Sequence, residues 1–261
     1  MKVYIHTDIE GVSGVVHWWR DEMWLNYSKD PLEVFDLKMR MRKLLTGEVN
    51  AAIEGALDAG ADEIVVNDSH GCGYNIIFED LHPKATIIHG EYDTLPFWLP
   101  EIGKGWDAVV AVGEHAMAGT KDAVLAHSKF IWNGDIALGE IGNVALLFGT
   151  LGIPLVFASG DNILKKEIKR LIPNIECAVV KTALTTNVAR SLHPSVAQEK
   201  IRKGVAKGLA KRKEIKPFKI KYPCTLVKRV SELREDKDVI LKGKNPIEVF
   251  KQLGPWNDYK I

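Results

Sequence analysis

Carboxylate and imidazole side chains recur in this sequence directly after short runs of β-branched residues. Asp8 follows the run KVYIHT, His70 lies in NDSHG after DEIVV, and His115 follows DAVVAVG after a single glutamate. Each residue alone is a weak indication of function, but the same residue types after several such runs indicate one shared site. The candidate residues are Asp8, Glu10, His70, His115, His127 and Glu140.

Asp8 and Glu10 lie two residues apart in the segment DIEG. In an extended chain this spacing places both carboxylates on one face, about 7 Å apart. Two carboxylates in that arrangement repel each other unless a cation lies between them. Gly11 and Gly14 would let the backbone turn closely around a bound ion. The alternative is that Asp8 and Glu10 line a solvated loop, and the histidines expected at the same edge argue against it.

The histidines also have ordinary structural interpretations. The residues around His70 in NDSHG all favour turns. His115 could be a core histidine with satisfied hydrogen bonds, although the segment AMAGT that follows it offers little apolar bulk to bury it. Cys72 has no partner at metal-ligand spacing, so we do not expect it to be a ligand or a nucleophile.

Three carboxylates and two imidazoles suit a pair of divalent ions better than one ion. The negative charges of Asp8, Glu10 and Glu140, together with a bridging hydroxide, balance the four positive charges of two such ions. Imidazole ligands favour zinc over magnesium or calcium. His127 is left over as a neutral group that could transfer a proton or stabilise an oxyanion. The chemistry implied is hydrolysis of an amide or ester by a metal-activated hydroxide, with two divalent ions per subunit, most suitably zinc.

The strands that must position these residues are short runs rich in Val, Ile and Ala. Several are continuous apolar runs, which are typical of parallel strands covered on both faces. In open α/β sheets, ligands bind beyond the carboxyl ends of such strands. We expect strands at residues 2–7, 62–67, 85–89, 107–113, 153–159 and 176–182.

Segments with helical periodicity separate the strands, and we expect helices at about 36–59, 138–151, 162–171 and 194–213. Pro194 marks the first turn of the last one, and Pro246 after Asn245 repeats that signal. The alternation predicts an α/β fold with three layers, α/β/α, around a mainly parallel central sheet. The lysine-rich stretch 200–221 predicts a solvated helix face followed by an edge strand. No change of composition marks a linker, so we expect a single domain over residues 1–261.

Composition excludes several classes of protein. With 35 basic and 34 acidic residues the formal net charge is +1, so neither a nucleic-acid partner nor a polybasic membrane anchor is expected. The three cysteines are widely separated and odd in number, which argues against a disulfide framework. The start of the chain lacks the pattern of a signal peptide, and the longest uncharged apolar stretch, 145–158, is too short to span a bilayer. We therefore expect a cytoplasmic protein.

A set of longer motifs occurs in order along nearly the whole chain. These are DIEGVSG, EVNAAI, VVNDSHG, LHP, GWDAVVAVGEHAMAGT, LAHS, WNG, GEIGN, GIPLVFASGD, IPN and VVKTA. In these motifs the chain resembles the M55 peptidases, the family of the bacterial zinc-dependent D-aminopeptidase. NDSHG and GEHAMAGT in register are the most specific of them. The resemblance is weaker in the C-terminal part, from about residue 184 to 261.

The resemblance implies a role for each candidate ligand. Asp8 would be shared by both zinc ions. Glu10 and His115 would bind one ion, and His70 and Glu140 would bind the other.

His127 matches the position that is usually labelled the active-site nucleophile of the family. A metal-bound hydroxide is a better nucleophile toward an amide, so we expect His127 to transfer a proton or to support the tetrahedral oxyanion.

Members of the family build large rings, the best-studied of them a decamer, and this implies a homo-oligomer here. The segment between GVSG and EVNAAI is longer than the family pattern and carries His17, Trp18, Trp19 and Trp24. The tryptophans favour a subunit contact or a core patch, because aromatic anchors dominate interfaces. A lid over the substrate pocket is the alternative.

These observations together predict a binuclear metallo-aminopeptidase that hydrolyses the N-terminal peptide bond of short peptides, including peptides with D-residues. One alternative is a metal-dependent amidase or esterase that acts on a non-peptide substrate through the same ligands. Another is a non-catalytic, metal-stabilised ring that binds peptides. The sequence leaves open the preference between D- and L-residues, the physiological substrate and the number of subunits.

Overall fold

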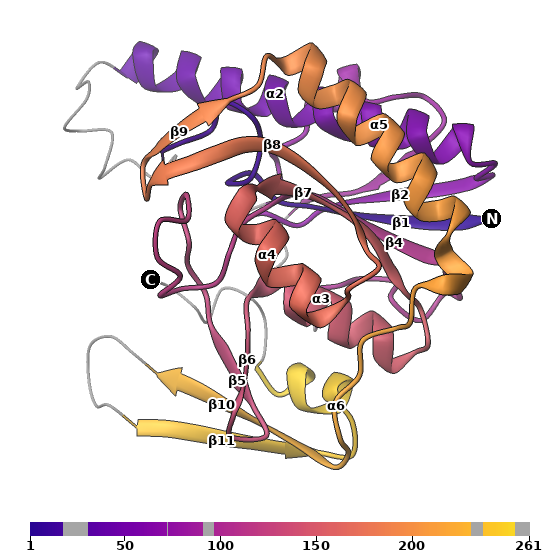
Figure 1. The fold of residues 1–261 in the computed structure, drawn as a ribbon, viewed down its shortest axis with the longest axis vertical. Coiled ribbons are helices and arrows are strands. Elements are labelled where there is room, and N and C mark those ends of the chain that lie inside the picture. Colours follow the sequence, from indigo (N-terminus) through magenta and orange to yellow (C-terminus); the bar gives the residue numbers. More distant parts are fainter. Residues whose placement is uncertain (18–30, 72, 91–96, 231–236, 254–261) are drawn as a thin grey trace.

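The computed structural model describes residues 1–17, 31–71, 73–90, 97–230 and 237–253 (Figure 1). Strands and helices alternate through the first 210 residues of this part of the chain. The strands of that region are β1 (Lys2–Thr7), β2 (Glu63–Asp68), β3 (Thr86–Ile88), β4 (Ala108–Glu114), β5 (Phe130–Trp132), β6 (Ile136–Leu138), β7 (Leu155–Asp161), β8 (Glu176–Thr185) and β9 (Val188–Ser191). The helices are α2 (Pro31–Asp58), α3 (Glu140–Thr150), α4 (Asn162–Leu171) and α5 (Pro194–Ala210), and short 3-10 turns lie at η1 (Phe78–Asp80) and η3 (Arg212–Glu214).

Seven of the described strands form one sheet in the order β3-β2-β1-β4-β7-β8-β9. All neighbours in it are parallel except β8 and β9. The central strands β1, β4 and β7 are almost entirely buried, as their continuous Val, Ile and Ala runs predict. The chain builds the sheet outward from β1, first to one side through β2 and β3 and then to the other side through β4. The carboxyl ends of β1 and β4 therefore meet at the point where the strand order reverses.

Helices cover both faces of the large sheet (Figure 1). Helices α2 and α5 pack against each other and against one face, and α3 and α4 pack against the other. The three-layer α/β/α fold expected from the sequence is confirmed. The expected strands and helices are present with ends shifted by a few residues, and α5 begins at Pro194 as expected.

The amino ends of three helices have side-chain caps. The Asp161 side chain accepts hydrogen bonds from the backbone N–H groups of Ile163 and Leu164 at the start of α4. The His193 side chain caps α5. Asn245 caps the C-terminal helix α6 (Pro246–Lys251), so the start signal at Asn245 and Pro246 is also confirmed.

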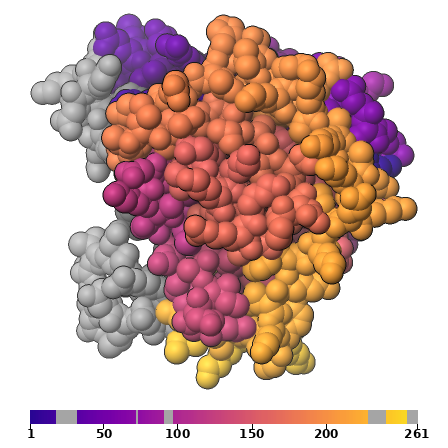
Figure 2. Space-filling view, viewed as in Figure 1, coloured from indigo at the N-terminus to yellow at the C-terminus, as the bar shows by residue number. Residues whose placement is uncertain are grey.

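A second sheet, which the sequence analysis did not predict, lies at the lower end of the molecule in Figures 1 and 2. It joins β5 and β6 to β10 (Cys224–Val230) and β11 (Lys237–Gly243) in the order β11-β10-β5-β6. The edge strand expected at the end of the lysine-rich stretch is wrong, since residues 216–221 form no strand and the next strand begins at Cys224. The ring of Phe250 in α6 stacks on Trp98 at 5.9 Å between centroids, which connects this sheet to the main core.

None of the helices within the described ranges combines the length and the apolar character needed to cross a membrane.

Helix α5 packs so closely on the sheet that a glycine is required at one position. A Cβ atom added to Gly208 would lie 2.6 Å from the carbonyl oxygen of Val156 in β7. Alanine normally stabilises a helix relative to glycine by about 1 kcal/mol. We nevertheless expect Gly208→Ala to lower the free energy of unfolding by about 1–3 kcal/mol, because the backbone must move apart.

Urea denaturation measures this change, and Lys200→Ala, at an exposed position of the same helix, is the control with an expected change within about 0.5 kcal/mol. A Gly208→Ala protein more stable than the parent would contradict the close packing.

Candidate metal centre

The loop after β1 carries Asp8 and Glu10 and lies against the end of β4. The Asp8 backbone N–H donates to the Val112 carbonyl at 2.8 Å, and the Gly11 N–H donates to the Gly113 carbonyl at 2.7 Å. A Cβ atom on Gly11 would lie 2.0 Å from the carbonyl oxygen of Glu114. Gly113 has a φ of +79°, and a Cβ atom there would lie 2.1 Å from the carbonyl oxygen of Asp8. Both glycines are therefore needed for the two chain segments to meet.

The structure brings all six predicted site residues together at the carboxyl edge of the sheet. Their ligand atoms form two groups, and within each group they lie within 4.8 Å of one another. The groups touch, because His115 Nε2 of one lies 3.4 Å from Asp8 Oδ2 of the other. One group is Asp8, Glu10 and His70, and the other is His115, His127 and Glu140.

The closest contacts pair these residues differently from the family resemblance. His70 Nε2 lies 3.1 Å from Glu10 Oε1, whereas His115 Nε2 lies 3.9 Å from Glu140 Oε1. The resemblance instead places Glu10 with His115 and His70 with Glu140. The strand order explains the contacts, since β1 and β2 are hydrogen-bonded neighbours and present Glu10 and His70 side by side.

Each of the three histidines is oriented by a hydrogen bond that its Nδ1 atom donates to an oxygen atom. His70 Nδ1 lies 3.1 Å from Asn75 Oδ1, and the amide of Asn75 is itself fixed by Asp68. His115 and His127 contact backbone carbonyls through Nδ1, at 2.8 and 3.0 Å. Because Nδ1 donates in each case, Nε2 is the nitrogen directed at the carboxylates. Metal-binding histidines are commonly held in this way.

Glu140 is the first residue of α3, where the amino end of the helix favours an anionic side chain. The start of this helix is fixed by Asn143, which donates to the Gly139 carbonyl and accepts from the indole N–H of Trp132. Ser128 donates to Glu140 Oε1 at 2.5 Å. The helix, the second sheet and the His127 loop therefore all contribute to the placement of one carboxylate.

Three potential metal-ligand atoms at the centre are buried and make no hydrogen bond to the residues that the structure describes. They are Asp8 Oδ2, Glu10 Oε2 and His115 Nε2. A buried polar atom without a partner costs about 1–3 kcal/mol, so three of them facing one another require a compensating ligand. Carboxylate oxygen and imidazole nitrogen are the donors that zinc takes, and these residues fit a divalent cation.

The pKa values of the metal-free protein show the same need for positive charge. Burial raises the pKa of Asp8 well above its ordinary value, and the neighbouring Glu10 adds to the effect. Burial acts in the same direction on Glu10 and Glu140, but the nearby imidazoles outweigh it and lower their pKa values, that of Glu140 to about 2. In return Glu140 raises the pKa of His115 to about 9 against the effect of burial. Protons on the imidazoles thus take the place of metal ions.

His127 differs from the other members of the cluster. Its side chain is 27% exposed, whereas those of the other five residues are 1–12% exposed. Burial and the adjacent His115 lower its pKa, so it is neutral at pH 7. The two imidazole rings stack at 3.9 Å. His127 is flanked by Leu125 and Ser128, both with φ of 52°, and such backbone conformations are frequent at functional sites.

Buried polar residues that the sequence analysis did not single out surround the cluster. His6 in β1 is buried, with Ser69 Oγ at 3.0 Å from its Nδ1 atom and Glu114 Oε1 at 3.6 Å from its Nε2 atom. On the other side of the loop are Lys181 and Glu48. The signal for Glu48 and Lys181 was their presence in the motifs EVNAAI and VVKTA. No periodicity or spacing connects these two motifs to residues 8–15.

Some expectations fall on residues outside the described ranges, namely Cys72 and the segment with Trp18, Trp19 and Trp24. Cys177 and Cys224, which are described, are free thiols.

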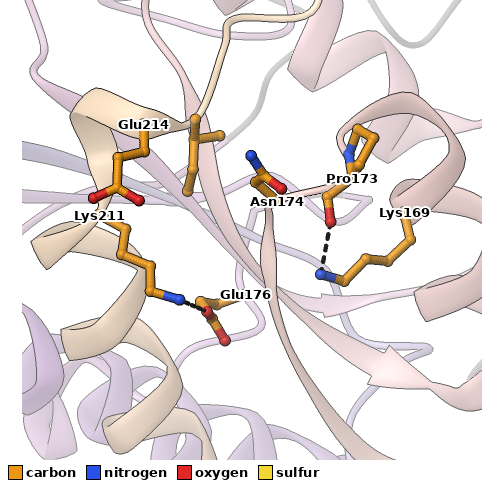
Figure 3. Close-up of a pocket in the computed structure, with 7 residues that line it drawn as sticks. Lys169, Pro173, Asn174, Glu176, Lys211 and Glu214 are labelled. Carbon is orange, nitrogen blue, oxygen red and sulfur yellow. Dashed lines mark hydrogen bonds and ion pairs between the residues drawn. The ribbon is translucent and has the colours of Figure 1, made fainter.

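A separate pocket of about 270 Å³ lies at the opposite edge of the sheet, between the end of α4, the start of β8 and η3 (Figure 3). Within it Lys211 forms an ion pair with Glu176 at 2.8 Å, and Lys169 donates to the Pro173 carbonyl. None of the six site residues lines this pocket, which lies at the amino ends of the strands, whereas the site lies at their carboxyl ends.

Known proteins match this chain over most of its length. A family model described as D-aminopeptidase, peptidase M55, matches residues 1–237. A D-aminopeptidase of Bacillus subtilis (strain 168) is 31% identical over 224 residues, which are 84% of this chain and 77% of the relative. A solved structure is described as the Zn-dependent D-aminopeptidase DppA from Bacillus subtilis, a self-compartmentalizing protease. It is 27% identical, with a TM-score of 0.80 over 97% of this chain and 95% of that one.

The raised pKa of His115 predicts how the stability of the metal-free protein depends on pH. The pKa is 6.5 in the unfolded chain and about 9 in the folded protein. The stability contributed by the proton is therefore complete below pH 6.5 and is lost as the pH rises through 9. With chelator present, we expect the thermal unfolding midpoint to fall across this window.

His115→Asn should make that decline shallower, because the variant has no imidazole to release a proton. Unfolding curves in chelator from about pH 6 to about pH 9.5 provide the comparison. Equal slopes for the parent and the variant would show that His115 does not hold this proton.

Proposed function

The chain belongs to the M55 peptidase family of D-aminopeptidases and is a metallo-aminopeptidase, and we propose that it removes the N-terminal residue from short peptides of D-amino acids. We further propose that two zinc ions per subunit serve this reaction. Their ligands are Asp8, Glu10, His70, His115 and Glu140.

One observation carries the proposal. Two adjoining groups of carboxylate and imidazole ligand atoms meet at the edge of the sheet, and three of these atoms, Asp8 Oδ2, Glu10 Oε2 and His115 Nε2, are buried without hydrogen-bond partners among the described residues. Such an arrangement is unfavourable unless cations occupy it, because Asp8 and Glu10 repel each other. The zinc dependence of the structural relative supports zinc as the ion. The position of Asp8, in contact with both groups, supports a role as the shared ligand.

When bound, two divalent ions acidify water and polarise the scissile carbonyl group. The protein's own side-chain and backbone groups hold the metal ligands and His127 in position. Asn75 and the carbonyl oxygens of Ala116 and Leu125 hold the imidazoles in one tautomer, so that no reorientation is needed as the site fills. Ser128 holds Glu140 in the same way.

His127 is the residue best suited to move a proton. It is neutral near pH 7 and more exposed than the ligands around it, so it can both accept a proton and reach a substrate. Its Nδ1 atom donates to the Leu125 carbonyl, which leaves Nε2 as the reactive nitrogen. We assign His127 as the general acid and base that transfers a proton to the leaving amine.

We also propose that the protein acts as a homo-oligomer that forms a ring. The structural relative is described as self-compartmentalizing, which requires several subunits around an enclosed space. Access to such a space would select short peptides over folded proteins.

The substrate is tested with matched peptides. Purified protein loaded with zinc should release free D-alanine from D-Ala-D-Ala faster than L-alanine from L-Ala-L-Ala, as followed by chiral chromatography of the products. Chelator should abolish the release, and added zinc should restore it, because the carboxylates cannot activate water without a cation.

The corresponding ester and acetylated peptide are the controls. Hydrolysis of the ester or of an N-blocked amide, with the free dipeptides left intact, would contradict the aminopeptidase assignment.

The role of His127 is tested by His127→Ala. We expect turnover to fall at least about a hundredfold, because general acid–base catalysis contributes about 10²–10⁴-fold, while the zinc content per chain stays unchanged. Metal analysis accompanies the kinetics on the same sample.

His89, an imidazole outside the cluster that stacks on Phe78, provides the matched control in His89→Ala. Loss of one zinc ion in His127→Ala would make His127 a ligand instead, and near-normal turnover would remove it from the mechanism.

A further inference from the structure

Lys181 is a buried lysine whose ammonium group is surrounded by backbone carbonyl groups. It lies in β8 and is 1% exposed. Its Nζ atom donates to the carbonyl oxygens of Glu10, Val12 and Val15, the last two at 3.1 and 2.5 Å. An ammonium group has three N–H donors and no acceptor. All three donors are therefore used, and Lys181 is held in the charged form.

All three acceptors belong to the loop that carries two of the proposed ligands. Glu10 contributes its carboxylate to the metal centre and its carbonyl oxygen to Lys181. The carbonyl groups of residues 10, 12 and 15 can converge on one atom only if the loop curls around it. The shape of the loop 8–15 is thus tied to the position of Lys181 Nζ.

A second set of contacts holds the same loop through Ser13. Its backbone N–H donates to Glu48 Oε1 in α2 at 2.9 Å. Its hydroxyl group lies 3.2 Å from the Val180 carbonyl and 2.7 Å from the Leu192 carbonyl. The loop is therefore fixed from its inner side by α2, β8 and the residue after β9.

The charge of Lys181 also matters to the centre. Burial lowers the pKa of Lys181 to about 8, so that it remains protonated near neutral pH. Asp161, Glu48, Glu10 and Asp8 counteract that lowering, which shows that the ammonium lies in the field of the carboxylates. Lys181 places one positive charge on the backbone side of the loop, opposite the side where metal ions would bind.

We propose that Lys181 is a positioning residue that, with Glu48, holds the loop 8–15 in the conformation that presents Asp8 and Glu10 to metal ions before these bind. This inference rests on the proposed function of those carboxylates. A loop that is already ordered loses little conformational entropy when the metal binds, and its ligands need not be gathered against their mutual repulsion. Lys181 therefore raises the affinity for the metal without touching it.

The test is the zinc affinity of metal-free Lys181→Met, measured by competition with a chromophoric chelator. Methionine has a similar length but lacks the three donors and the charge. We expect zinc to bind about 10- to 100-fold more weakly than to the parent protein. This is the typical loss of affinity when a residue that positions metal ligands is mutated.

Leu209→Ala is the matched control for loss of stability. Leu209 is fully buried in α5 near the start of β8, at the opposite edge of the sheet from the loop. We expect its zinc affinity to stay within about twofold of the parent protein, although the protein unfolds more easily. An affinity loss in Leu209→Ala as large as that in Lys181→Met would mean that affinity follows stability alone and would overturn the inference.

Ser13→Ala provides a milder variant and decides the question if Lys181→Met does not fold. It removes only the hydroxyl contacts of the loop, and we expect a loss of zinc affinity of about threefold or more with little change in unfolding temperature. Zinc affinity equal to that of the parent in the folded variants would overturn the inference and leave the proposed function intact. A parent protein that binds no zinc would instead overturn both.

Discussion

The rest of the structure depends on the confinement of several carboxylates in a buried space. Asp8 and Glu10 are buried at the edge of a sheet, and Glu140, 12% exposed, lies in the adjoining group, so little water screens their charges. Burial alone already penalises each negative charge, and proximity adds repulsion between them. Positive charge at the same place stabilises the arrangement, whether it comes from protons on Asp8 and the imidazoles or from divalent ions. The chemistry of the protein follows from this one electrostatic requirement.

The fold meets the requirement by surrounding the carboxylates with rigid elements. The strand order reverses between β1 and β4, so loops from both strands reach the same point without obstruction. Gly11 and Gly113 allow the two backbones to touch, and hydrogen bonds donated by Nδ1 orient each imidazole. Cationic charge then acts from two sides of the loop 8–15. Lys181 donates hydrogen bonds to the backbone carbonyl groups of this loop, and metal ions would bind its carboxylate side chains.

Much of this arrangement could be predicted from the sequence, because the residues concerned follow buried strands. Asp8, His70 and His115 each lie just beyond a continuous apolar run, and parallel strands bring such positions to one edge. The second sheet could not be predicted, since β5 and β6 have three residues each and β5 joins them to β10, a strand about ninety residues further along. A three-residue strand carries no measurable periodicity. The roles of Lys181 and Glu48 could not be predicted either. Both residues contact backbone atoms of the loop 8–15, and every residue type has such atoms, so no pattern of residue types indicates these contacts.

The central claim is that these residues hold a pair of metal ions, and the most direct test is an anomalous difference map at the zinc absorption edge from crystals grown with zinc. The account predicts two peaks per chain, each about 2.0–2.2 Å from carboxylate oxygen or imidazole nitrogen atoms. The atoms should belong to Asp8, Glu10, His70, His115 and Glu140, with Asp8 next to both peaks. Zinc peaks confined to surface histidines, with the five side chains still gathered and no peak among them, would contradict it.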